Sequence, residues 1–153
     1  MAIRVIHGLE ELRSLVGQVI GASDWVEITQ DQVQKFADAT GDHQWIHCDP
    51  ERARRESPYG GPVAHGFLTL SLGPALAQQI FTVEGVKMGV NYGLNRVRFP
   101  AAVMVGARVR MISQLTDLKE GVEGVTLTYK QTFEVEGEGR PCCVAEMMAR
   151  LYF

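Results

Sequence analysis

The chain has 153 residues, of which 46% are apolar and 22% are charged, and its formal net charge is −3. This length fits one globular domain spanning residues 1–153, because domains usually contain about 100–200 residues. The nearly balanced charge argues against a nucleic-acid-binding protein, and no apolar run reaches the roughly 18 residues of a membrane-spanning helix. The first eleven residues lack the apolar core of a signal peptide, so we expect a cytoplasmic protein.

The three cysteines are Cys48, Cys142 and Cys143. Their spacing matches neither a disulfide framework nor a CxxC zinc pair. We therefore expect three reduced side chains that behave as small hydrophobic residues.

The first clear element is a helix that begins after Thr29 and stops at Thr40-Gly41. Thr29 and Gln32 have the spacing of a capping box, and Gly41 can supply the left-handed residue after the last turn. The apolar stripe of this helix consists of Val33, Phe36, Ala37 and Ala39. A second, short helix is predicted from Asp49-Pro50 to Arg54 or Arg55, with residues 42–48 forming a loop between the two.

An uncharged segment, Gly66–Phe81, follows the turn-rich stretch 58–62. Its apolar residues lie on every side of a helical projection, which predicts a helix that is buried all round. Gly73-Pro74 in its middle should bend the helix or leave a carbonyl unpaired.

The second half of the chain predicts strands. Residues 125–135 alternate between apolar and polar side chains with almost no exception, and residues 108–115 and 143–151 show the same period. Glycine-rich connectors at 121–124 and 137–141 predict an antiparallel meander. Two further strands are expected at 95–99 and near 19–28.

The architecture depends on which segment covers the buried face of this sheet. One face of a long antiparallel sheet must be buried, and the segment 66–81 is the uncharged helix available to cover it. We therefore expect an α+β domain in which a curved antiparallel sheet wraps around one central helix.

Three of the four histidines, His43, His47 and His65, surround the start of the uncharged helix. His43 and His47 have the i, i+4 spacing of two zinc ligands, but Gly41-Asp42 indicates a loop and the HExxH glutamate is missing, so we expect no metal. A purely structural role, in which the histidines cap and hydrogen-bond loops, stays open.

Asp42 and His47 stand at the two ends of the loop and could form a carboxylate–imidazole pair. Such a pair can hold one water and move its protons near neutral pH. Gly66, at the head of the helix, has an N–H without an intrahelical acceptor, which could serve as an oxyanion hole or could simply end a loop. Together with an apolar helix, these features indicate chemistry on an acyl group.

These residues resemble the motifs of the MaoC-like dehydratases, the R-specific enoyl-CoA hydratases of the hot-dog fold. The family signature is Gly-Asp-x-Asn-Pro-x-His, then an acidic-Pro helix, then Pro-x-x-His-Gly. The matching residues are Gly41, Asp42, Ile46, His47, Asp49, Pro50, Pro62, His65 and Gly66. Gln44 and Trp45 replace the family's Asn-Pro, as in members described as nodulation-protein-like. With the segment 91–106, the resemblance covers about residues 17–153.

The resemblance implies a lyase that adds water to trans-2-enoyl thioesters to give (R)-3-hydroxyacyl thioesters, or catalyses the reverse dehydration. Asp42 and His47 would be catalytic, and the Gly66 N–H would bind the thioester carbonyl. The other substrate-binding residues would be His65, Ser71 and Asn95, although Ser71 could equally be a core serine. The resemblance implies no metal or redox cofactor, with CoA or an acyl carrier forming part of the substrate, and a homodimer joined through its sheets.

Two other functions stay open. A hot-dog thioesterase would release the acyl group of a saturated acyl-CoA without hydrating crotonyl-CoA. A non-catalytic acyl-thioester binding or assembly subunit would be unaffected by Asp42→Asn or His47→Gln, whereas a hydratase would lose at least about 10²-fold in rate. Arg52, Arg54 and Arg55 could meet CoA phosphates or could form a solvated helix face.

Overall fold

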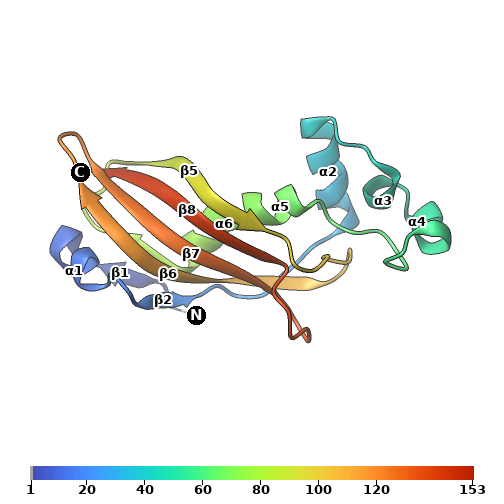
Figure 1. Ribbon diagram of the computed structural model, residues 1–153, viewed down its shortest axis with the longest axis horizontal. Helices are drawn as coiled ribbons and strands as arrows, with labels where there is room; N and C mark the ends of the chain where they lie inside the picture. Colours follow the sequence, from blue (N-terminus) through green and yellow to red (C-terminus); the bar gives the residue numbers. More distant parts are fainter. Residues whose placement is uncertain (1) are drawn as a thin grey trace.

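The computed structural model describes residues 2–153. Six antiparallel strands form the main sheet in the order β2-β6-β7-β8-β5, with β3 also paired to β6 (Figure 1). These strands are β2 (Val19–Ala22), β3 (Val26–Glu27), β5 (Met88–Arg98), β6 (Arg108–Glu120), β7 (Val125–Val135) and β8 (Cys143–Tyr152). Two short strands, β1 (Arg4–Ile6) and β4 (Phe81–Val83), form a separate parallel pair.

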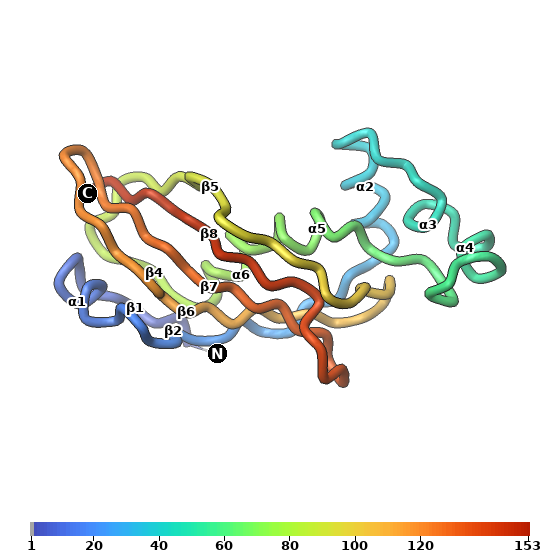
Figure 2. Tube along the Cα trace, in the orientation of Figure 1, coloured from blue at the N-terminus to red at the C-terminus, as the bar shows by residue number. Residues whose placement is uncertain are grey.

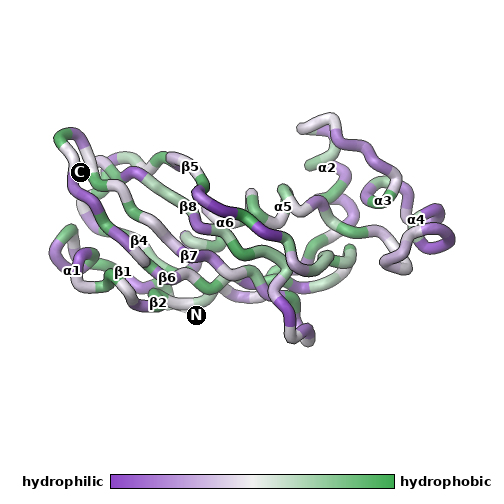
Figure 3. The backbone as a smooth tube through the Cα atoms, viewed as in Figure 1, coloured by the Kyte–Doolittle hydropathy of each residue, from purple (hydrophilic) through white to green (hydrophobic). Residues whose placement is uncertain are grey.

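The predicted meander is confirmed as β6, β7 and β8. Their alternating side chains put one face of the sheet into the core, and Figure 3 shows the matching alternation of hydropathy along these strands. The fully buried residues of this face include Val109, Met111, Leu115, Leu127 and Phe133. Burial of one face explains why the register is well specified, because a slip by one residue would expose this whole set.

The segment that covers this face consists of two helices, α5 (Gly66–Ser71) and α6 (Gly73–Ile80). The expected irregularity at Gly73-Pro74 is confirmed, but it separates two helices, so the expectation of one bent helix through Phe81 is wrong. Pro74 lacks an N–H and begins a new helix, and Phe81 already belongs to β4. The expected burial on all sides is also wrong, since Leu68 and Leu76 are buried while Phe67 on the opposite side is 68% exposed.

The strand β5 is longer than the expected 95–99 and begins at Met88. Gly89 and Gly93 interrupt the alternation of its first half, which hides the strand in the sequence. β5 lies at one edge of the sheet, and its side chains are almost all exposed. The other edge is formed by the short strands β2 and β3, which fall inside the expected region 19–28.

Three helices, α2 (Gln30–Thr40), α3 (Trp45–Cys48) and α4 (Pro50–Glu56), group at one end of the molecule beyond the sheet (Figures 1 and 2). The predicted caps of α2 are confirmed, because the Thr29 side chain accepts from the Gln32 N–H and Gly41 is left-handed with φ of 83°. Asp49 caps α4 in the same way. The expected loop 42–48 is partly wrong, since its last four residues form α3.

The N-terminal residues contribute β1 and a helix that the sequence did not reveal, α1 (Gly8–Ser14). Cys48, Cys142 and Cys143 are free thiols, as expected. Within the described part of the chain, every helix is too short or too polar to cross a membrane.

Candidate active site

Asp42 and His47 are placed by the end of α2 and by the single turn of α3. The left-handed Gly41 ends α2 and turns the chain, so that Asp42 is the first residue of the loop that follows. The carbonyl of Gln44 then accepts hydrogen bonds from the N–H groups of His47 (3.0 Å) and Cys48 (3.2 Å). This local ladder turns the side chain of His47 toward the segment that leads into α5.

Two crossed hydrogen bonds join this loop to the segment 63–66. His47 Nδ1 lies 2.6 Å from the carbonyl oxygen of Val63, and His65 Nε2 lies 2.9 Å from the carbonyl oxygen of Asp42. A third bond, from the Val63 N–H to the Ile46 carbonyl (3.0 Å), runs between the same segments. Each histidine thus binds the backbone of the segment that carries the other one.

These contacts define the tautomers of both rings. A carbonyl oxygen only accepts, so His47 carries its proton on Nδ1 and His65 on Nε2. The free nitrogens are Nε2 of His47 and Nδ1 of His65. The two rings stack at 3.8 Å between centroids with 24° between their planes, and Phe36 packs on His65 at 4.8 Å.

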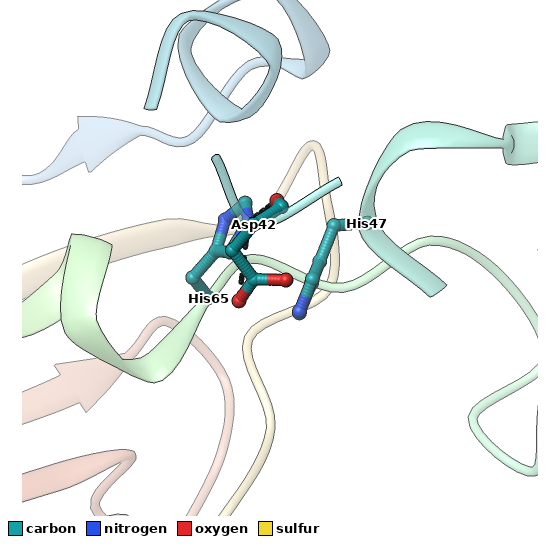
Figure 4. A group of neighbouring side chains, drawn as sticks. All are labelled: Asp42, His47 and His65. Carbon is teal, nitrogen blue, oxygen red and sulfur yellow. Dashed lines mark hydrogen bonds and ion pairs between the residues drawn. The ribbon is translucent and has the colours of Figure 1, made fainter. Parts of the chain in front are cut away.

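Asp42, His47 and His65 converge, each offering a side-chain atom within 4.8 Å of the others (Figure 4). In this view a ring nitrogen of His47 and the Asp42 carboxylate face the same space. Two hydrogen bonds of about 2.8 Å to one tetrahedral oxygen span about 4.6 Å. Because Asp42 and His47 lie within 4.8 Å of each other, one water can reach both groups.

The electrostatics of His47 favour a neutral ring. Burial lowers its pKa below the ordinary value of 6.5, and the neighbouring His65 lowers it further. The Val63 carbonyl and Asp42 oppose this shift but do not reverse it. At neutral pH the Nε2 atom of His47 is therefore available as a proton acceptor.

A profile of the family described as "MaoC like domain" matches residues 11–136. The chain belongs to the MaoC-like family. It is 52% identical over 97% of its length to 3-hydroxyacyl-thioester dehydratase Z of Mycobacterium tuberculosis, of which it covers 98%. It is 44% identical over 95% of its length to nodulation protein N of Rhizobium leguminosarum bv. viciae, of which it covers 91%.

The fold also matches a solved structure, the (R)-hydratase from A. caviae involved in PHA biosynthesis, with a TM-score of 0.72 and 24% identity. The match covers 88% of this chain and 96% of the hydratase chain. The predicted MaoC-like family and the α+β hot-dog fold are thus confirmed.

The departure from the usual MaoC motif at Gln44 and Trp45 leaves the loop intact. Gln44 stands at the N-cap position of α3 without a side-chain cap, and its N–H donates to the Asp42 carboxylate at 3.4 Å. Trp45 packs outward beneath the guanidinium of Arg52, 4.3 Å from the ring centroid. Arg52 also pairs with Glu56, which agrees with a solvated helix face rather than a phosphate site.

Gly66 opens α5 where the expected oxyanion donor should stand. A Cβ at this position would lie 3.1 Å from the ring of Phe99, so close packing on this ring also requires glycine. The first-turn N–H of Gly66 has no acceptor within its own helix, which leaves it available to a ligand.

Ser71 and Asn95 are not brought to Asp42 and His47 within one chain. Ser71 is exposed rather than a core serine, and its hydroxyl donates to the Phe67 carbonyl at 2.6 Å. Asn95 donates to Glu146 at 3.1 Å, and Glu146 follows Ala145 of the buried face, so this contact lies on the outer face of the sheet. Their substrate-binding roles stay predictions.

The residues that could bind a metal differ from the His43–His47 pair considered from the sequence. His43 bonds to Asp38 at 2.9 Å, away from His47, so the i, i+4 pair does not converge. The group that does converge contains His65 instead. Lone pairs of imidazole lie in the ring plane, and two stacked, nearly parallel rings do not aim them at one ion about 2.0–2.1 Å from both nitrogens. The arrangement suits proton transfer better than metal binding.

Sequence reasoning missed the groups that orient the histidines. These are the Val63 carbonyl, the Gln30 side chain, which donates to the His47 carbonyl at 2.7 Å, and the Phe36 ring. Phe36 was visible as part of an apolar stripe, but backbone acceptors such as Val63 carry no signal in their residue type.

Proposed function

We propose that this chain catalyses the reversible hydration of trans-2-enoyl thioesters to (R)-3-hydroxyacyl thioesters. The observation that carries the proposal is the convergence of Asp42 and His47 within 4.8 Å, with Nδ1 of His47 bonded to the Val63 carbonyl and Nε2 left free. The 52% identical relative named 3-hydroxyacyl-thioester dehydratase supports the same reaction class.

In the proposed mechanism, the water donates one hydrogen bond to Asp42 and one to His47 Nε2. The thioester carbonyl accepts from the Gly66 N–H, which stabilises the enolate-like charge that develops as the water oxygen attacks C3. The proton removed from the water returns through the pair to C2, so that one water adds across the double bond. Dehydration runs through the same steps in reverse, and CoA or an acyl carrier enters only as part of the substrate.

We further propose that two copies of the chain pair through β5. No strand within residues 2–153 covers the outer edge of β5. Along it lie the exposed side chains of Met88, Val90, Tyr92 and Leu94. A long apolar edge of this kind is a template for strand pairing, and a two-fold axis would join the two sheets. Sedimentation tests this pairing: the wild type should be a dimer and Tyr92→Asp a monomer. A monomeric wild type would contradict the proposal.

The reaction is tested by following the loss of enoyl absorbance with enoyl-CoA esters of increasing chain length, together with chiral analysis of the product. Asp42→Asn and His47→Asn should each lose at least about 10²-fold in kcat/KM. The asparagine amide can replace the Nδ1–H of His47 toward Val63 but offers no ring nitrogen in place of Nε2, so the fold is retained.

His43→Asn serves as the matched control, because His43 bonds to Asp38 on the exposed side of the same loop. It should keep the wild-type rate. Release of free CoA from saturated acyl-CoA without hydration would instead identify a thioesterase. Wild-type hydration rates in both Asp42→Asn and His47→Asn would remove the catalytic pair from the mechanism.

A further inference from the structure

A cavity of about 350 Å³ lies between α6 and the strands β4, β5 and β8. A second cavity of about 340 Å³ adjoins it and begins at Leu70 and Ser71 on α5. The two share Pro74, Asn91 and Met147 in their walls. Together they run along the two helices from Leu70, about one helical turn beyond Gly66, to Gln78 near the end of α6.

The wall of the first cavity is not purely apolar. Gln131 and Tyr129, neighbours on the inner face of β7, both line it. Gln131 is 1% exposed, and its Oε1 atom has no hydrogen-bond partner within residues 2–153. Oε1 lies 3.1 Å from where a Cβ of Gly73 would stand, so the glycine at the helix break makes room for this amide.

A buried amide without a partner is destabilising, and such groups usually bind water or a ligand. The other inward residues of β7, including Leu127 and Phe133, are apolar. Burial also raises the pKa of Tyr129 far above its ordinary value, so that it stays a neutral phenol. The cavity thus presents neutral hydrogen-bonding groups within an apolar wall.

We propose that this cavity receives the distal part of an acyl chain that carries a hydroxyl group, and that this hydroxyl donates a hydrogen bond to Oε1 of Gln131. The inference rests on the proposed function, which places the thioester at Gly66. From Gly66 to Gly73 the helical segment rises about 10 Å at about 1.5 Å per residue, so a medium-length chain reaches Gln131. A neutral oxygen suits this pocket, because a charged group would be buried without a counter-charge.

The first experiment uses the wild-type protein and two unreactive saturated esters, octanoyl-CoA and ω-hydroxyoctanoyl-CoA. Calorimetric titration should give about tenfold tighter binding of the hydroxylated ester, the size expected of one added hydrogen bond to a buried group. Equal affinities, as expected if a partner chain filled the cavity, would overturn the inference. This comparison does not depend on catalysis, so it is separate from failure of the proposed reaction.

The second experiment compares Gln131→Leu with Gln114→Leu. Leucine keeps much of the volume but no hydrogen-bonding group, and Gln114 lies on the adjacent strand β6, where it bonds to the Gly17 carbonyl. Gln131→Leu should abolish the preference for the hydroxylated ester, while Gln114→Leu keeps it. A preserved preference in Gln131→Leu would refute the assignment, and if that variant fails to fold, the wild-type affinities decide.

Discussion

The hydrogen bond from His65 to the Asp42 carbonyl makes His65 a positioning residue whose contribution can be isolated. His65→Phe removes this bond but keeps an aromatic ring between Phe36 and His47. One such bond is worth about 0.5–1.5 kcal/mol, which changes the ratio of correctly placed to displaced Asp42 by about two- to thirteenfold. We expect kcat for enoyl-CoA hydration to decrease by a factor within that range.

The variant His65→Gln provides the matched rescue, because the terminal amide of glutamine can replace the Nε2–H of histidine. Its kcat should lie within about twofold of wild type. Both variants also remove the imidazole that lowers the pKa of His47, so the pH at which activity is half-maximal should rise alike in both, and the difference in kcat between them reports the positioning role. Wild-type kcat in His65→Phe, or equal damage in His65→Gln, would refute the reasoning.

Three further predictions concern other groups. Because the pKa of His47 lies below 6.5, kcat/KM should be constant above that pH and fall below it. On acidification the unfolded state binds this proton before the folded state does, so the free energy of unfolding should decrease for wild type relative to His47→Asn. Urea unfolding measures this difference. Thr29→Ala should cost about 1 kcal/mol in the same assay by uncapping α2, and no loss would contradict the cap. Burial raises the pKa of Cys142 to about 11 and of Cys143 to about 12, so neither should react with a thiol reagent at mildly alkaline pH until the protein is denatured.

The sequence predicts the regular parts of this fold well, because their physical signals are local. The capping of α2 by Thr29 and Gly41 and the alternation of β7 depend on near neighbours in the chain. The first half of β5 escapes recognition, since its glycines contribute no side chain to a period. The exposed face of α5, with Phe67, escapes it too, because residue type alone does not say what covers a helix.

For the candidate site, the sequence predicts which residues lie together better than how they are oriented. Asp42 and His47 do converge, as expected from the loop between them. The stacking of His65 on His47, and the placing of Asn95 on the other face of the sheet, depend on segments far apart in the chain and on a bulge in β5. Such features follow from tertiary packing, which local patterns do not encode.

The crossed hydrogen bonds of His47 and His65 end on carbonyl oxygens, and this choice of acceptor has an evolutionary consequence. A carbonyl is supplied by every residue, so mutation at Val63 leaves the acceptor of His47 in place. Gln44 and Trp45 are free to vary for the same reason, since neither side chain takes part in the bonds that join the two segments. Libraries that randomise positions 44 and 45, which are exposed and half-buried respectively, can therefore alter the surface beside the site without disconnecting the two histidines.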